Sequence, residues 1–196
     1  ALRGLVKDER TYVYLMSSKS MADLEALSRA VPEAGLIAED GCYVRHCVCG
    51  GPLAWTSLVD GFDAQWRQPV REILDYFTER TPGSWIEERD TAIAWYFGSD
   101  SASPTDLSWA QRQSSEVQSL ISDSLGERFA LRILRRQSHF VIMPKNVSRM
   151  SAVQYVLALD IMGSLPKRCH GIKGMFEFVL HIGRDEKLIA HLNGLD

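Results

Sequence analysis

Two short apolar stretches near the start of the chain have the pattern of buried strands separated by a helix. Residues 11–16 (TYVYLM) and 35–39 (GLIAE) are runs of strand length that are followed by polar or turn-forming residues. Between them Ser20 is followed three residues later by Asp23, which predicts the start of a helix, and Pro32 ends the helical spacing of apolar residues. A strand, a helix and a second strand in this order predict a parallel α/β sheet.

The spacing of apolar positions changes after residues 50–52 (GGP). From Trp66 to Phe77 apolar residues recur every three or four positions, which predicts an amphipathic helix that ends near Arg80. We expect the following elements to be strands over residues 84–89 and 91–97, a polar loop over 98–106, a helix over 109–125, and a hairpin formed by 130–136 and 139–143. Helices grouped with neighbouring antiparallel strands predict an α+β insert over residues 51–142.

The last part of the chain returns to the α/β pattern. We expect a helix over residues 148–162, a buried strand over 176–182 that stops at Gly183, and a short helix over 185–192. The predicted organisation is the first part of an α/β core at residues 1–50, an α+β cap at 51–142, and the second part of the core at 143–196.

Composition and charge exclude several classes of protein. The 196 residues are 45% hydrophobic and 24% charged, so global disorder is not expected. The formal net charge of -3 is spread along the chain and provides no basic surface for nucleic-acid phosphates. Apolar runs are too short to cross a membrane, and the first ten residues are too polar for a signal peptide. We expect a cytoplasmic protein, and the first residue, Ala rather than Met, suggests a piece of a longer one.

The four cysteines do not indicate a disulfide framework. Cys47 and Cys49 lie beside His46, but zinc requires a fourth ligand and usually a wider spacing. We therefore interpret them as ordinary thiols. The five tryptophans are interpreted as part of the core of the cap, because aromatic side chains bury large areas: Trp55, Trp66, Trp85, Trp95 and Trp109.

Three segments in fixed order carry a resemblance to a known family: GLIAEDGC at residues 35–42, ERTPGSWIEERDTAIAWYF at 79–97, and the strand with its Gly, Asp and Glu at 176–186. The chain resembles the trehalose-6-phosphate phosphatases of the haloacid-dehalogenase-like superfamily. Among these it is most similar to the phosphatase-like domains of fungal regulatory subunits of the trehalose synthase complex. The resemblance implies a parallel-sheet α/β core, whose first strand would precede residue 1, and an inserted α+β cap.

The family's catalytic groups are mostly absent from the corresponding positions of the core. The nucleophile belongs to a D-x-D motif, and no D-x-D occurs in these residues. The resemblance assigns vestigial phosphate-binding positions to Ser17 and Arg149, where the family has a Ser or Thr and a Lys. The family's metal-binding segment has contracted to a loop that retains Asp185 and Glu186 but places Arg184 where a carboxylate is usual. We expect no catalytic residues and no metal, because a cation beside the site repels Mg²⁺ and replaces a ligand.

The sugar-binding positions of the cap are also altered. The resemblance assigns vestigial sugar contacts to Glu87 and Arg89. At the other family positions the chain has residues that differ from those of active enzymes: Gly98, Gln137, His139 and Val141. An apolar side chain in place of a carboxylate leaves sugar hydroxyls without partners.

The resulting expectation is a catalytically inactive domain that has a regulatory or scaffolding role and binds other subunits of a trehalose synthase/phosphatase complex. Two alternatives stay open: an active, Mg²⁺-dependent phosphatase whose nucleophile precedes residue 1, and a sensor that binds a sugar phosphate without turnover. Individual residues also have simpler interpretations. Ser17 is typical of a turn at a strand end, Arg149 of a solvated helix start, and Asp185 and Glu186 of acids at a helix N-terminus.

Overall fold

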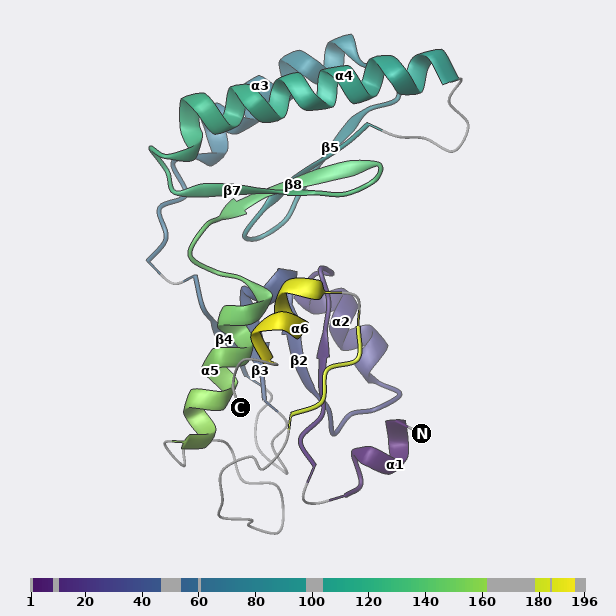
Figure 1. Ribbon diagram of the computed structural model, residues 1–196, viewed down its shortest axis with the longest axis vertical. Helices are drawn as coiled ribbons and strands as arrows, with labels where there is room; N and C mark the ends of the chain where they lie inside the picture. Colours follow the sequence, from purple (N-terminus) through teal and green to yellow (C-terminus); the bar gives the residue numbers. More distant parts are fainter. Residues whose placement is uncertain are drawn as a thin grey trace. The chain divides into compact units, whose positions relative to one another are not determined.

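The structure is a computed structural model that describes residues 2–8, 11–46, 54–59, 61–97, 104–161, 179–183 and 185–192 (Figure 1). The chain divides into two compact units. The first unit comprises Ala1–Leu58 and Val147–Asp196, and the second comprises Val59–Asn146. The second unit is therefore inserted between the two parts of the first.

The first unit contains a mixed four-stranded sheet in the order β1-β2-β3-β4. Its strands are β1 (Tyr14–Met16), β2 (Gly35–Ala38), β3 (Tyr43–Arg45) and β4 (Trp55–Ser57). β1 and β2 pair in parallel, with Tyr14 opposite Gly35, whereas the other two pairs are antiparallel. The predicted parallel pair is confirmed. β3 and β4 are additional strands that the pattern did not predict, and β4 belongs to the first unit although we expected residues 51–142 to lie in the cap.

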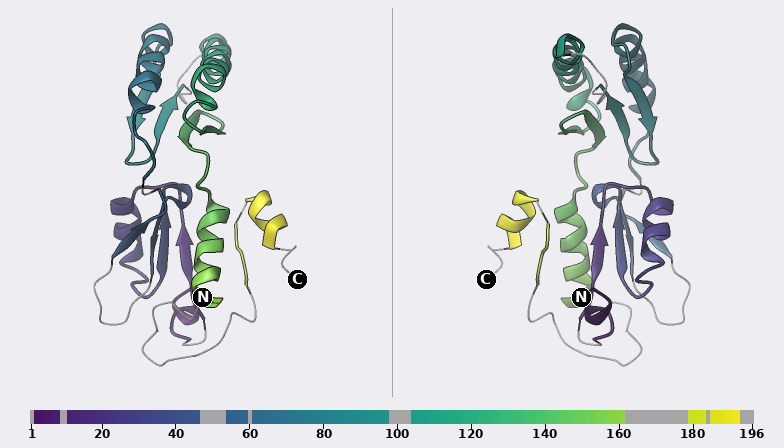
Figure 2. Two further views of the ribbon diagram at one scale, coloured as in Figure 1. Left: turned by 90° about the vertical axis from the view of Figure 1, so that its left-hand side faces the viewer. Right: turned by 90° about the vertical axis from the view of Figure 1, so that its right-hand side faces the viewer.

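Helices complete the first unit (Figure 2). They are α1 (Leu2–Leu5), α2 (Met21–Ser28), α5 (Arg149–Ile161) and α6 (Glu186–Leu192). α2 connects the parallel strands, and its predicted N-cap is confirmed: the Ser20 hydroxyl accepts a hydrogen bond from the amide of Asp23 at 3.2 Å. α5 packs against the sheet through Ala152 and Val156, which contact Ile37 and Val44 in a small buried cluster.

The strand predicted over residues 176–182 is wrong over its described part. Residues 179–182 have no strand partner within the described segments, and residues 176–178 lie outside them. Leu180 and Ile182 are 66% and 84% exposed. An apolar run alone predicts burial, but a strand requires a partner with free backbone groups as well.

The second unit is an antiparallel sheet in the order β5-β6-β8-β7 with two helices on one face (Figures 1 and 2). The strands are β5 (Trp85–Glu88), β6 (Ile93–Tyr96), β7 (Leu131–Arg135) and β8 (His139–Pro144). α3 (Arg67–Arg80) ends at the predicted residue. α4 (Pro104–Ile121) begins five residues before the predicted start and continues into the π-helical turn η2 (Ser122–Gly126).

The core of the second unit lies between the helices and the sheet. Trp66, Leu74, Trp95 and Phe140 are all fully buried there. Trp95 also donates from Nε1 to the hydroxyl of Thr78 on α3 at 2.8 Å. The interpretation of all five tryptophans as cap core is correct only for Trp66 and Trp95. Trp55 lies in the first unit, and the two others are 51% and 44% exposed: Trp85 and Trp109.

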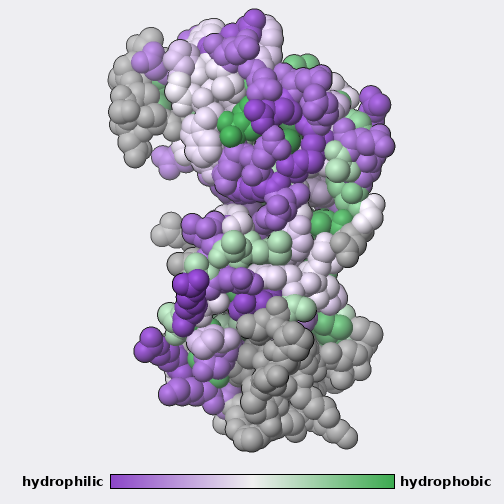
Figure 3. Space-filling model, turned by 180° about the vertical axis from the view of Figure 1, so that it is seen from behind, coloured by the Kyte–Doolittle hydropathy of each residue, from purple (hydrophilic) through white to green (hydrophobic). Residues whose placement is uncertain are grey.

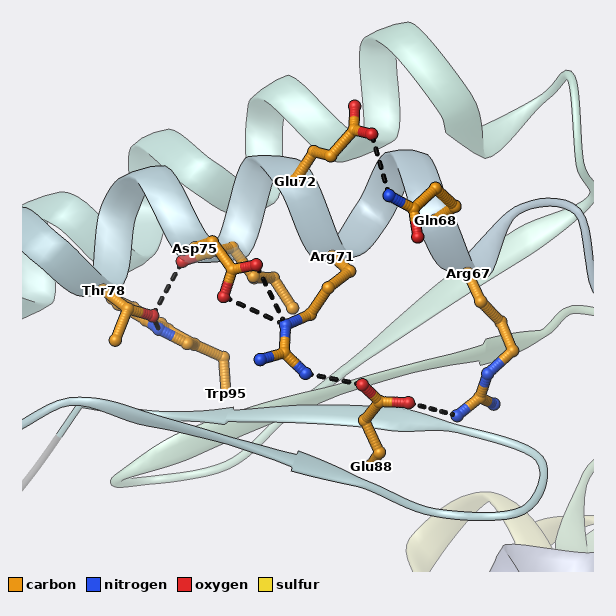
Figure 4. A network of polar contacts seen from close by, with 9 residues as sticks. Arg67, Gln68, Arg71, Glu72, Asp75, Thr78, Glu88 and Trp95 are labelled. Atoms are coloured by element: carbon orange, nitrogen blue, oxygen red, sulfur yellow. Dashed lines mark hydrogen bonds and ion pairs between the residues drawn. The ribbon is translucent and has the colours of Figure 1, made fainter.

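Polar contacts join α3 to the edge of this sheet (Figure 4). The Glu88 carboxylate on β5 accepts hydrogen bonds from Arg67 at 3.2 Å and from Arg71 at 2.5 Å. Arg71 also pairs with Asp75 one turn along the helix. These groups are partly exposed, so buried apolar packing makes the larger contribution to holding the helix, and the ion pairs fix its position along β5.

Candidate functional site

The first candidate site lies in the first unit, at the carboxyl end of β1. Ser17 follows this strand directly, and its amide donates to the carbonyl of Ile37 on β2 at 2.9 Å. Its hydroxyl accepts from the amide of Lys19 at 3.2 Å, and its carbonyl accepts from the amide of Asp40 at 3.1 Å. Ser17 therefore organises the turn through three hydrogen bonds and joins the ends of the two parallel strands.

A tight turn after β2 brings Asp40 to the same place. The turn is η1 (Glu39–Gly41), in which all three residues have positive φ values of 46°, 54° and 108°. A Cβ on Gly41 would lie 2.3 Å from the carbonyl oxygen of Ser148, so only glycine fits beside the start of α5. The GLIAEDGC segment thus has a structural task, which is to place the Asp40 carboxylate against this helix.

The Asp40 carboxylate binds Arg149, the first residue of α5. Arg149 Nε donates to Asp40 Oδ1 at 2.8 Å, and Nη2 of the same side chain lies 2.7 Å from that oxygen. Arg149 Nη1 lies 3.5 Å from Asp185 Oδ2. The Asp40 side chain is only 4% exposed, while those of Arg149 and Asp185 are 29% and 25% exposed. One guanidinium is therefore shared by two carboxylates, and the group as a whole has a net negative charge.

The two acidic residues of the predicted metal loop, Asp185 and Glu186, lie at the N-terminus of α6. Asp185 accepts a hydrogen bond from the amide of Leu188 at 3.1 Å, so the same side chain both caps α6 and contacts Arg149. Glu186 is exposed in the first turn of α6. Within the described residues no group of three or more His, Cys, Asp or Glu side chains is placed to hold a metal ion.

The structure thus brings Ser17, Arg149 and Asp185 into one region and adds Asp40. The sequence contained one signal for Asp40, an Asp-Gly pair directly after a buried strand. Its contact with Arg149, 109 positions away, could not be predicted from local pattern.

The second candidate site is the face of the second unit's sheet opposite the helices. Glu87 and Arg89 lie on this face at the sheet edge formed by β5. Arg89 Nη2 donates to Glu87 Oε2 at 2.9 Å and to the hydroxyl of Tyr96 at 3.1 Å, and that hydroxyl donates to the same Glu87 oxygen at 2.7 Å. The hydrogen bond from Arg89 lowers the pKa of Glu87, and burial raises the pKa of Tyr96.

Three aromatic rings stack across neighbouring strands of this face. Trp85 and Tyr96 are parallel with centroids 4.1 Å apart, and Tyr96 and His139 follow at 4.5 Å. The stack results from register, since Tyr96 lies opposite both Trp85 and His139. Val141 is buried, whereas Gly98 lies outside the described residues. Sequence reasoning missed Tyr96, which alternates along β6 with the buried Trp95.

The chain matches a known protein family over most of its length. The family model for trehalose-phosphatase matches residues 1–186. The chain belongs to the trehalose-phosphatase family.

Two relatives from Schizosaccharomyces pombe illustrate the range of this family. A protein named trehalose-phosphatase is 29% identical over 156 residues, and a putative alpha,alpha-trehalose-phosphate synthase [UDP-forming] 100 kDa subunit is 29% identical over 157 residues. Each match covers 80% of this chain but 17% of the relative. The chain therefore spans less than a fifth of the length of these curated relatives.

Solved structures show the same fold. The C-terminal domain of Candida albicans trehalose-6-phosphate phosphatase matches with a TM-score of 0.70 and 25% identity, over 80% of this chain and 51% of that one. The C-terminal domain of the Candida albicans trehalose synthase regulatory protein matches with a TM-score of 0.66 and 20% identity, over 98% and 59% of the two chains. The fold of this trehalose-phosphatase family member is haloacid-dehalogenase-like, as predicted. In the described segments no helix is long and apolar enough to span a bilayer.

Proposed function

We propose that this chain is a catalytically inactive phosphatase-like domain with a regulatory or scaffolding role in a trehalose-synthesising complex. The observation that carries the proposal is the position of Arg149, the cation that stands at the family's phosphate-binding Lys position, between the carboxylates of Asp40 and Asp185. A site for a phosphoryl group requires excess positive charge. Here one guanidinium stands between two carboxylates, so the formal charge of the three groups is negative.

Displacing these contacts costs free energy. A phosphate ester approaching Arg149 meets two like charges and must compete with an ion pair whose Asp40 side chain is 4% exposed. Removing one partner from a buried pair leaves an uncompensated charge, which is strongly unfavourable. A divalent cation could offset the repulsion, but in the sequence a basic residue, Arg184, stands directly before Asp185, where the family has a carboxylate. The nucleophile motif D-x-D is also absent from these residues.

The second unit supports the same proposal. Glu87 Oε2 is used by both Arg89 and Tyr96, so the retained sugar-binding carboxylate already has intramolecular partners. A sugar hydroxyl would replace existing hydrogen bonds rather than satisfy free groups, and such exchange contributes little net affinity. Membership of a complex is supported by the relative named as a synthase subunit, which has the same 29% identity as the phosphatase.

An active, Mg²⁺-dependent trehalose-6-phosphate phosphatase is the alternative, favoured by the relatives named trehalose-phosphatase. The decisive assay uses the protein with its native upstream segment, trehalose-6-phosphate and Mg²⁺, and measures released phosphate. We expect none above background. Release that a chelator abolishes would overturn the proposal, and Arg149→Lys serves as the matched variant, since restoring the family's cation alone is not expected to create activity.

A sugar-phosphate sensor is the second alternative, and calorimetry with trehalose-6-phosphate distinguishes it. A micromolar dissociation constant corresponds to about -8 kcal/mol, which a site with its polar groups internally paired is not expected to provide.

The scaffold role is tested by deleting this domain from its parent protein and measuring the size of the complex by gel filtration. An unchanged complex with unchanged trehalose output would exclude it.

A further inference from the structure

The outer face of the second unit contains an apolar groove that neither candidate site uses. It has a volume of about 560 Å³ and lies between α3 and the end of α4. Its lining is mainly apolar: Pro69, Ile73, Tyr76, Phe77, Leu120 and Leu125, with Glu72 and Ser124. Tyr76 on α3 and Leu120 on α4 are 53% and 44% exposed and line the same groove, and contiguous exposed apolar surface of this kind marks an interaction site. Figure 3 shows apolar surface (green) enclosed by polar surface (purple) on one face of the second unit.

Acidic side chains flank this groove on both helices. On α3, Glu72 belongs to the lining and Glu79 lies three residues after Tyr76. On the other side, Glu116 and Asp123 lie four residues before and three residues after Leu120. All four are exposed, and helical spacing of three or four places each on the face next to a lining residue. One basic residue stands beside them: the Arg80 guanidinium lies over the Tyr76 ring, 3.5 Å from its centroid, so four acidic side chains face one arginine.

Helix geometry indicates what fits. The α3 residues that line the groove run from Pro69 to Phe77, about 12 Å at about 1.5 Å per residue, so the groove contacts roughly two turns of a bound helix. A groove with an apolar floor and edges that carry more acidic than basic side chains favours an amphipathic helix with apolar anchors three, four and seven positions apart and basic residues beside them. The groove continues beside the π-helical turn η2, whose wider backbone brings Leu125 to its end.

We propose that this groove, which we name the α3–α4 groove, binds a basic amphipathic helix of a partner subunit. The inference rests on the proposed scaffold function and specifies the surface that would perform it. The apolar contacts provide affinity, and the acidic flanks select a basic partner and make binding sensitive to salt.

The test uses a fluorescent synthetic helix of about 16 residues with Leu at the anchor positions and Lys beside them. Its matched control has the same Leu positions with Glu in place of Lys. Binding to the full chain is measured by fluorescence anisotropy. We expect saturable binding of the Lys helix that weakens at least tenfold with Leu120→Asp and several-fold with Glu72→Lys. The control variant is Trp85→Ser, on the opposite face of the sheet, which should change the affinity for the Lys helix less than twofold.

Three results would overturn the proposal. The first is that the Glu helix binds as tightly as the Lys helix or more tightly, and the second is that Leu120→Asp leaves binding unchanged in a chain whose circular dichroism is also unchanged. The third is that a second copy of the chain occupies the groove, which would be seen as self-association that Leu120→Asp abolishes. The same variant in the parent protein separates this inference from the scaffold function. If deleting the domain breaks the complex but Leu120→Asp does not, the scaffold role stands and the α3–α4 groove is not its surface.

Discussion

At the residue scale, the central feature is an arginine that has two carboxylate partners. Asp40 is held in place by a backbone turn with positive φ at three successive residues, and Gly41 makes room for it beside α5. The buried Asp40 side chain forms an ion pair with Arg149. We therefore expect the contact between Asp40 and Arg149 to contribute to the stability of the fold.

This ion pair predicts the effect of removing the cation. Arg149→Ala leaves the Asp40 carboxylate buried without its ion pair and should lower the free energy of unfolding by about 2 to 4 kcal/mol. Arg149→Lys should cost less, since it keeps the charge but loses the forked hydrogen bonds. Urea denaturation at neutral pH measures both. Lys19→Ala, an exposed cation near the same turn, is the control, with an expected change within about 0.5 kcal/mol. If Arg149→Ala also changes the free energy of unfolding by only about 0.5 kcal/mol, solvent screens the ion pair between Asp40 and Arg149.

The Glu87 cluster predicts a pH dependence of stability. The hydrogen bond from Arg89 lowers the pKa of Glu87 below its ordinary value of 4.5. A folded-state pKa below the unfolded one stabilises the protein above the unfolded value, and this contribution is lost as the pH falls through the folded pKa. The stability difference between wild type and Glu87→Gln should therefore be constant from pH 6 to 8 and decrease below about pH 4.5. Urea denaturation at each pH measures it, and a constant difference down to pH 3 would contradict the prediction.

At the scale of elements, the chain shows which features local sequence determines. α3 ends at the predicted Arg80 because its apolar stripe is regular, and the hairpin β7–β8 follows the predicted segments with Ile133 opposite Ile142. β3 (YVR) and β4 (WTS) were missed because neither is an apolar run, and each depends on pairing, not on its own pattern. The same limit applies to the site. Ser17 and Arg149 could be placed by resemblance, whereas the Asp40 contact depends on a turn geometry that no apolar pattern encodes.

The N-cap of α2 provides a test at this scale. The Ser20 hydroxyl accepts from the Asp23 amide and donates to the Asp23 carboxylate at 2.9 Å. Ser20→Ala should lower the free energy of unfolding by about 1 kcal/mol, and Ser20→Asn, which keeps an acceptor, by only a few tenths. Chemical denaturation of the three proteins under one condition measures the difference. Equal losses for Ala and Asn would mean that the cap does not stabilise α2, whose eight residues connect the parallel strands.

At the scale of the whole molecule, the second unit is continuous in sequence while the first is assembled from both ends of the chain. The second unit has its own sheet, two covering helices and a core that contains Trp66, Trp95 and Phe140. The proposed α3–α4 groove lies entirely within it. A continuous segment with its own core can in principle fold alone.

The last prediction follows from this organisation. A fragment of residues 59–146 should fold independently, because its buried cluster is drawn from its own strands and helices and Arg67 and Arg71 join α3 to β5 within the same fragment. We expect a single cooperative urea transition by circular dichroism. Trp95→Ala, which removes a fully buried ring and its hydrogen bond to Thr78, should cost about 3 to 5 kcal/mol and abolish the transition. Trp85→Ala, at a half-exposed ring, should leave the transition in place. A fragment without cooperative unfolding would show that the first unit is required to fold the second, and the isolated fragment could then not be used to test the groove.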